Sequence, residues 1–170
     1  MDQLDQMEHL EKATSAAIPH VDVRLVKFSQ ACTVLLTALA FITQQPWLVA
    51  VAAVALGLSA AFPAIGPFRL LYRAVVVPLH LLTPRIVEDD PAPHRFAQAI
   101  GTLFLVSSSL MLLGTEATAL GWTLDLVVFV LSTINFTVGF CAGCFVYYHL
   151  GRLGVLPRVR YSGGFHWRGV

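Results

Sequence analysis

The sequence predicts an all-α membrane protein with four transmembrane helices and an interfacial amphipathic helix between the second and the third. Two observations lead to this prediction. First, 56% of the 170 residues are hydrophobic and only 12% are charged, whereas a soluble domain has about a quarter of its residues charged. Second, the basic residues lie in alternate connections between apolar stretches. The net charge of +1 gives no indication of a nucleic-acid partner.

Four apolar stretches approach the roughly 20 residues that a helix needs to cross a bilayer. We expect spans at about residues 28–43, 47–62, 96–114 and 122–146. The turn Gln44–Pro46 separates the first two, and Trp122 is placed as an interfacial aromatic residue. The sequence thus divides into an N-terminal segment (1–27), a membrane domain (28–150) and a basic tail (151–170). The acidic start of the chain is unlike a secretory signal, so no cleaved signal is expected.

The basic residues predict the orientation of the chain. All eleven lie before span one, between spans two and three, or after span four: Lys12, Arg24, Lys27, Arg69, Arg73, Arg85, Arg95, Arg152, Arg158, Arg160 and Arg168. The other two connections have none. By the positive-inside rule both termini are cytoplasmic, and we expect a multi-pass protein. Asp125, just inside span four, is expected to reach the outer interface or to cap its helix.

The central connection predicts a helix on the membrane surface at about residues 67–82. At 100° per residue, Arg69, Arg73 and His80 fall on one face, and apolar side chains fill the rest. These three residues are expected to contact lipid phosphates. The alternative is that they line a cytoplasmic vestibule for an anion.

The chemically informative motif is Cys141-Ala142-Gly143-Cys144 near the end of span four. On one continuous helix, Thr137, Cys141, Cys144 and Tyr148 would share a stripe. The pair would lie at the cytoplasmic boundary, at the level of Cys32, where thiols are normally reduced. Late in a helix a thiolate is disfavoured, so reactivity would need help from Arg152, Arg95 or a helix break at Gly139 or Gly143.

Three interpretations of the cysteines stay open. In the first, Cys144 attacks and Cys141 resolves in thiol redox or sulfur-relay chemistry with a thioredoxin-like or other membrane-protein partner. In the second, the pair binds or transports a soft metal or a sulfur anion, with Cys32 and His149 as further ligands or with Cu(I) on the pair alone. In the third, the cysteines only pack.

The remaining polar and small residues leave the activity open. An alternative is that the protein is an accessory subunit of a larger complex or an oligomer, packed through Gly139 and Gly143. Asn135 is expected to find a partner on a neighbouring helix. The histidines in the polar flanks, His20, His94 and His166, are expected to be solvated. No sequence motif identifies an enzyme class or a cofactor.

Three short motifs resemble the bacterial integral membrane family described as domain of unknown function 4395. They are Val21-Asp22-Val23-Arg24, the run from Arg95 to Gly101, and Gly139-Phe140-Cys141-Ala142-Gly143-Cys144 with a tyrosine close behind. The resemblance covers about His20 to Leu150. It departs from the family pattern at Tyr147-Tyr148-His149, where a single tyrosine is expected. It implies a small multi-span protein of the bacterial cytoplasmic (inner) membrane with a CxGC motif and no particular activity.

Overall fold

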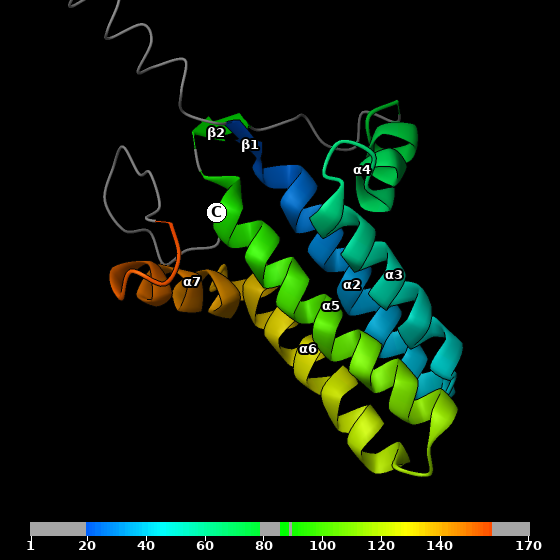
Figure 1. Cartoon of the computed structure of the whole chain (residues 1–170). Helices are drawn as coiled ribbons and strands as arrows, with labels where there is room; N and C mark the ends of the chain where they lie inside the picture. Colours follow the sequence, from blue (N-terminus) through cyan, green and yellow to red (C-terminus); the bar gives the residue numbers. More distant parts are fainter. Residues whose placement is uncertain (1–19, 79–85, 89, 158–170) are drawn as a thin grey trace, which may run out of the picture.

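A computed structural model describes residues 20–78, 86–88 and 90–157, and this part of the chain is almost entirely helical. Four helices run side by side: α2 (Val23–Thr43), α3 (Pro46–Ala61), α5 (Pro91–Gly114) and α6 (Thr118–Val138) (Figure 1). At one end of this bundle, α7 (Ala142–Arg152) leaves the direction of α6, and the short α4 (Pro67–Leu71) lies beside α2 and α3.

Three of the helices, α2, α5 and α6, are long and apolar enough to cross a membrane, so the protein is a multi-pass membrane protein. The helix predicted as the second span, α3, is also apolar but has only 16 residues. The fourth predicted span, 122–146, is wrong at its end, because α6 stops at Val138 and a separate helix follows. The first span begins five residues earlier than expected, at Val23 rather than Phe28.

Small and branched apolar side chains form the centre of the bundle. Ala40, Val49, Leu56, Leu105 and Val128 are buried there, one or two from each of the four long helices. With little hydrophobic driving force between helices inside a lipid environment, close packing of this kind is the main source of association.

Buried hydroxyls in the bundle are satisfied by backbone carbonyls. Thr33, Thr37 and Ser109 each donate to the carbonyl four residues earlier in their own helix. Ser108 instead donates across to the carbonyl of Gly121, at 2.7 Å, and so ties α5 to α6. The Ser107–Ser109 run is therefore compatible with a membrane-spanning helix, as expected for serines that bond to carbonyls.

Two aspartates start the helices on either side of a short strand pair. Asp22 caps α2 by accepting a hydrogen bond from the amide of Arg24, and Asp90 caps α5 by accepting one from the amide of Ala92, each at 3.0 Å. Between these caps, β1 (His20–Asp22) pairs antiparallel with β2 (Ile86–Glu88), with Val21 opposite Val87. The sequence analysis did not predict this pairing, which joins the beginnings of α2 and α5 (Figure 1).

Of the helix predicted at residues 67–82, the structure describes helical backbone from Pro67 to Val76, and its expected place on a membrane surface stays a prediction. After α4, residues Tyr72–Val76 continue as one π-helical turn. Phe68, Tyr72 and Val76 are buried, while Arg69 is half-buried and Arg73 is exposed. The ring of Tyr72 packs against Phe28 of α2, at 5.5 Å between ring centroids. His80 lies outside the described residues.

The basic residues of the described part belong to segments at one end of the bundle. They lie in the first turns of α2 and α5, in and just after α4, and at the end of α7: Arg24, Lys27, Arg69, Arg73, Arg95 and Arg152. The α2–α3 and α5–α6 connections, at the opposite end in Figure 1, contain none. The described basic residues, which fall in alternate connections of the sequence, therefore lie together at one end of the helix bundle.

Asp125 differs from its prediction. Its side chain is fully buried, and among the described residues neither carboxylate oxygen has a hydrogen-bond partner. It neither reaches the outer interface nor caps α6, because the seven residues from Thr118 to Leu124 place it well inside the helix, on a face that is covered by the bundle.

Candidate functional site

The chain breaks its helix immediately before the two cysteines. Gly139 ends α6 in the left-handed conformation (φ 77°), and its amide donates to the carbonyl of Asn135. Glycine adopts this conformation at little cost and is the usual residue just past a helix end. The predicted continuous helix through the motif is therefore wrong, and the predicted stripe of Thr137, Cys141, Cys144 and Tyr148 does not exist.

The break places the cysteines at the beginning of a helix instead of its end. Cys141 is extended and occupies the N-cap position of α7, where its Sγ accepts a hydrogen bond from the backbone amide of Cys144 at 3.2 Å. The amide groups and dipole of a helix N-terminus favour a thiolate at this position. The sequence predicted the pair near the C-terminal end of a helix, where a thiolate is disfavoured, whereas the structure places it at a helix N-terminus, where a thiolate is favoured.

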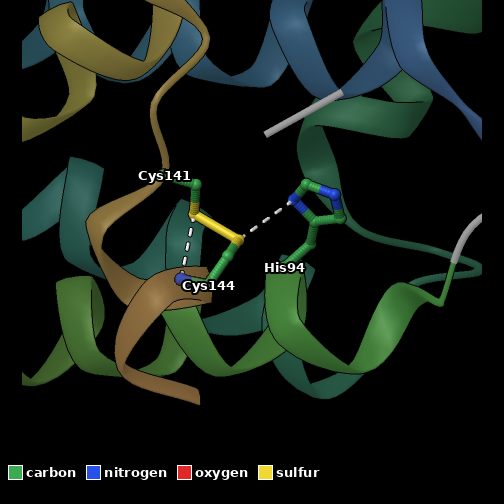
Figure 2. Close-up of a disulfide and its surroundings, with 3 residues drawn as sticks. All are labelled: His94, Cys141 and Cys144. Carbon is green, nitrogen blue, oxygen red and sulfur yellow. Dashed lines mark hydrogen bonds between the residues drawn. A yellow bond between two sulfur atoms is a disulfide. The ribbon is translucent and has the colours of Figure 1, made fainter. Parts of the chain in front are cut away.

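The two sulfur atoms are joined in a disulfide, with the Cα atoms 5.2 Å apart (Figure 2). The sequence analysis expected reduced thiols at this depth, so the structure differs from that expectation. The difference follows from the local geometry, since an N-cap residue and the third residue of the first turn bring their side chains together above the helix end.

The two cysteines differ in accessibility. Cys141 has only 2% of its surface exposed, whereas Cys144 is half-buried. A reagent or a partner thiol approaching the disulfide therefore meets the sulfur of Cys144 first.

His94 lies beside the disulfide. Its Nδ1 is 3.8 Å from the Sγ of Cys144, and its imidazole ring points toward that sulfur in Figure 2. The side chain is half-buried, so the prediction of a solvated flank residue is wrong. A signal was present in the sequence: Asp90-Pro91 is a helix start with a cap and a proline at the first position, which puts His94 in the first turn of α5.

A close contact between α5 and α7 holds His94 and the cysteines together. A Cβ atom added at Gly143 would lie 2.5 Å from the Cβ of Ala97, so the glycine lets the two helices touch. One turn further along α7, the ring of Tyr147 packs on Phe96 at 5.4 Å between centroids. Gly143 thus serves packing within the chain and does not pair with Gly139 on a helix face, which corrects the predicted docking surface for a partner.

A cavity of about 130 Å³ reaches the disulfide from inside the bundle. Cys141, Ala142 and Gly143 form part of its wall, and Phe104 and Val128 are among its apolar residues. Its polar residues come from three helices and are Ser29, Gln30, Thr33, His94, Gln98, Ser132 and Asn135. The Oδ1 atom of Asn135 is buried and has no hydrogen-bond partner among the described residues. The wall is mainly apolar, with a minority of polar groups to which a water molecule or a small ligand could bond.

The other predicted site residues lie outside the cluster. The hydroxyl of Thr137 bonds to carbonyls of its own helix, and the guanidinium of Arg95 donates to the carbonyl of Ala60 at the end of α3. The exposed ring of His149 contacts Phe145 and Tyr148. Cys32 is a free thiol on α2 that packs against the core of the bundle. None of these four belongs to the one group of potential metal ligands found among the described residues, His94, Cys141 and Cys144.

The site thus belongs to a small multi-pass membrane protein with a CxGC disulfide at the start of a helix, next to a histidine. Residues 21–152 match the family described as domain of unknown function (DUF4395), and the chain belongs to this family. The match confirms the resemblance noted in the sequence. Neither the curated proteins nor the solved structures contain a match to the chain.

Proposed function

We propose that the protein carries out thiol–disulfide exchange through Cys141 and Cys144. The observation that carries this proposal is the position of the pair at the N-terminus of α7, where the Cys144 amide donates to the Cys141 sulfur. A CxxC pair in this position can alternate between disulfide and dithiol, because the helix end stabilises the thiolate that forms when the bond opens.

The difference in burial between the two cysteines identifies Cys144 as the sulfur that an incoming thiolate attacks. A thiolate of a dithiol donor attacks the Sγ of Cys144, and the bond between the two cysteine sulfurs breaks. The electron pair of that bond leaves on Cys141, whose thiolate then accepts a hydrogen bond from the Cys144 amide. The second thiol of the donor, as its thiolate, then attacks the donor sulfur in the mixed disulfide and releases Cys144. The donor ends as a disulfide, and the pair ends as a dithiol carrying two protons from the donor. The reverse sequence oxidises the pair.

His94 is suited to a supporting role in both directions. With Nδ1 at 3.8 Å from the Cys144 sulfur, the imidazole can accept a proton from the Cys144 thiol as it becomes the attacking thiolate. It can return the proton when Cys144 is the leaving group, in the manner of a cysteine–histidine pair.

The test of exchange is a redox titration of the protein in detergent micelles. Purified protein is equilibrated with glutathione buffers of graded potential, quenched with a maleimide that adds mass, and resolved by electrophoresis. We expect one two-electron transition that is present in Cys32→Ser and absent in Cys141→Ser and Cys144→Ser. A pair that stays fully oxidised over the whole glutathione range would show a structural disulfide and contradict the proposal.

We further propose that the end of the bundle bearing α7 faces the cytoplasm. The basic residues of the described part gather at that end, and positive charge is retained on the cytoplasmic side of membranes. A membrane-impermeant maleimide should therefore label reduced Cys144 in inverted vesicles and leave it unlabelled in intact cells. Labelling in intact cells alone would reverse the orientation.

A further inference from the structure

We propose that, once the disulfide is reduced, Cys141, Cys144 and His94 form a binding site for a Zn²⁺ ion. The Sγ atoms of the two cysteines and a ring nitrogen of His94 all lie within 4.8 Å of one another. The three donors come from the starts of two different helices, α5 and α7, which the contact between Gly143 and Ala97 holds together. The inference goes beyond thiol exchange, because metal binding requires no turnover.

The spacing of the donors fits tetrahedral zinc. Zn–S bonds of about 2.3 Å and Zn–N bonds of about 2.0 Å place neighbouring ligand atoms roughly 3.5–3.8 Å apart. The distance of 3.8 Å from His94 Nδ1 to Cys144 Sγ lies at the upper end of this range. A pair of cysteines separated by two residues is also a frequent zinc-binding spacing. Reduction frees the two sulfur atoms to move apart to the same separation.

Charge selects a divalent ion. Two thiolates and a neutral imidazole balance Zn²⁺ to zero net charge, whereas Cu(I) would leave a negative charge in a half-buried site at the edge of an apolar bundle. A buried uncompensated charge is costly. The amide of Cys144, which donates to the Cys141 sulfur at 3.2 Å, would remain as a partner of a metal-bound thiolate.

Three protein ligands leave one position of the tetrahedron open. The cavity of about 130 Å³ touches both His94 and Cys141, so there is room next to the cluster for water or another exchangeable ligand. Zinc sites with three protein ligands and an exchangeable fourth are the kind that do chemistry, whereas structural sites have four protein ligands.

Oxidation and metal binding exclude each other at this site. Reduction of the disulfide consumes two electrons and two protons, and binding of Zn²⁺ to the dithiol releases two protons, because thiolates are the ligands. Zinc therefore binds only the reduced protein and holds it in that state.

The experiment is a zinc titration of the full chain in detergent, reduced with a phosphine under argon and then freed of reductant. A chromophoric chelator competes for the metal, and a parallel titration with Co²⁺ reports thiolate coordination by its charge-transfer absorption. We expect one zinc per chain in the reduced protein and none at this site in the disulfide form. His94→Ala should weaken binding by at least about tenfold, a lower bound because loss of an outer-shell partner alone costs 10- to 100-fold. The controls Cys32→Ser and His149→Ala should bind as the wild type does.

Each outcome decides the proposal. Unchanged zinc affinity in the Cys141→Ser/Cys144→Ser double variant would place the metal elsewhere in the chain and overturn the proposal, as would equal affinity in His94→Ala. The redox titration of His94→Ala in glutathione buffers shows whether that variant still forms its disulfide and hence is folded at the site. If it does not, His94→Gln serves in the same comparison. Thiol exchange without zinc binding would overturn this inference and leave the proposed function intact.

Discussion

The backbone amide of Cys144 donates a hydrogen bond to the Sγ of Cys141, at 3.2 Å, across the first turn of α7. This contact makes the two cysteines chemically different. Cys141, whose sulfur accepts the hydrogen bond, has only 2% of its surface exposed. The sulfur of Cys144 lies next to His94. Cys141 is thus the stabilised thiolate, and Cys144 is the sulfur that a partner can reach.

The first prediction concerns the reactivity of the reduced pair. Cys144 should be alkylated by iodoacetamide roughly tenfold or more faster than Cys141, because the reagent can reach the half-buried Cys144 while Cys141 is almost fully buried, and cysteine reactivity requires access as well as a thiolate. Peptide mass spectrometry of samples quenched at intervals measures both rates in one experiment. Cys32, half-buried in the bundle, is the internal reference. Equal rates for the two cysteines would remove the basis for assigning them different roles.

The second prediction concerns the contact that joins α7 to α5. Gly143→Ala should destabilise the protein by about 1–3 kcal/mol, because the new methyl group would overlap Ala97 in a packed contact. Thermal unfolding in detergent measures the loss. Gly114→Ala is the matched control, since a Cβ at Gly114 meets nothing within 4 Å. The double variant Gly143→Ala/Ala97→Gly should recover only part of the stability, because the Ala97 Cα, 2.7 Å from the added atom, remains. A loss in Gly143→Ala no larger than that in Gly114→Ala would argue against this contact.

The third prediction concerns the hydroxyl bond between α5 and α6. Ser108→Ala should cost about 0.5–1.5 kcal/mol, because the carbonyl of Gly121 loses the hydroxyl that donates to it from α5. Ser109→Ala should cost less, since the hydroxyl of Ser109 bonds only to the carbonyl of Leu105 in its own helix. Unfolding by a denaturing detergent, followed by circular dichroism, ranks the two variants. The reverse ranking would contradict the bridging role of Ser108.

The fourth prediction is a loss of stability at alkaline pH that depends on Tyr147. Burial against α5, and secondarily the nearby Asp90, raises the pKa of Tyr147 above its ordinary value of 10.0. The folded state therefore holds the phenol proton more tightly than the unfolded chain does. This contribution is fully present below the unfolded pKa and is lost as the pH rises through the folded pKa.

Thermal unfolding across that alkaline range checks the prediction. Tyr147→Phe should lose less stability than the wild type on going from neutral to strongly alkaline pH. Tyr148→Phe, changed at the neighbouring tyrosine, is the matched control and should follow the wild type. Burial also raises the pKa of Tyr72, so some alkaline sensitivity should remain in Tyr147→Phe.

Composition and charge predicted most of the fold. The helices, the turn at Gln44–Pro46 and the grouping of basic residues at one end follow from properties that act over long stretches of sequence. The bounds of α3 lie within one residue of the predicted 47–62. The strand pair was harder, because three-residue strands have no periodicity. Asp125 was assigned to the interface because a buried carboxylate without a partner is uncommon.

The site was predicted only in its cysteines. Gly139 determines the rest of the site, because it ends α6 and turns the chain. Cys141 and Cys144 therefore lie at the start of α7 and not at the end of a continuous helix. Glycine is a frequent helix terminator, but the apolar residues on both sides of Gly139 favoured a continuous span. A helix break at Gly139 was considered from the sequence as one way to make the cysteines reactive, but cysteine is absent from the usual N-cap residues, so the start of a new helix at Cys141 was not predicted. His94 was missed because its contact with Cys144 spans 50 residues of sequence.

The most direct measurement of the central claim is the capture of mixed disulfides by single-cysteine variants of the pair. Membranes containing Cys141→Ser or Cys144→Ser, each in a Cys32→Ser background, are treated with glutathione disulfide, and the protein is weighed by intact mass spectrometry. The account predicts rapid glutathione addition at Cys144 in the Cys141→Ser protein and little or none at Cys141 in the Cys144→Ser protein. Equal addition to both variants, or addition to neither, would contradict it.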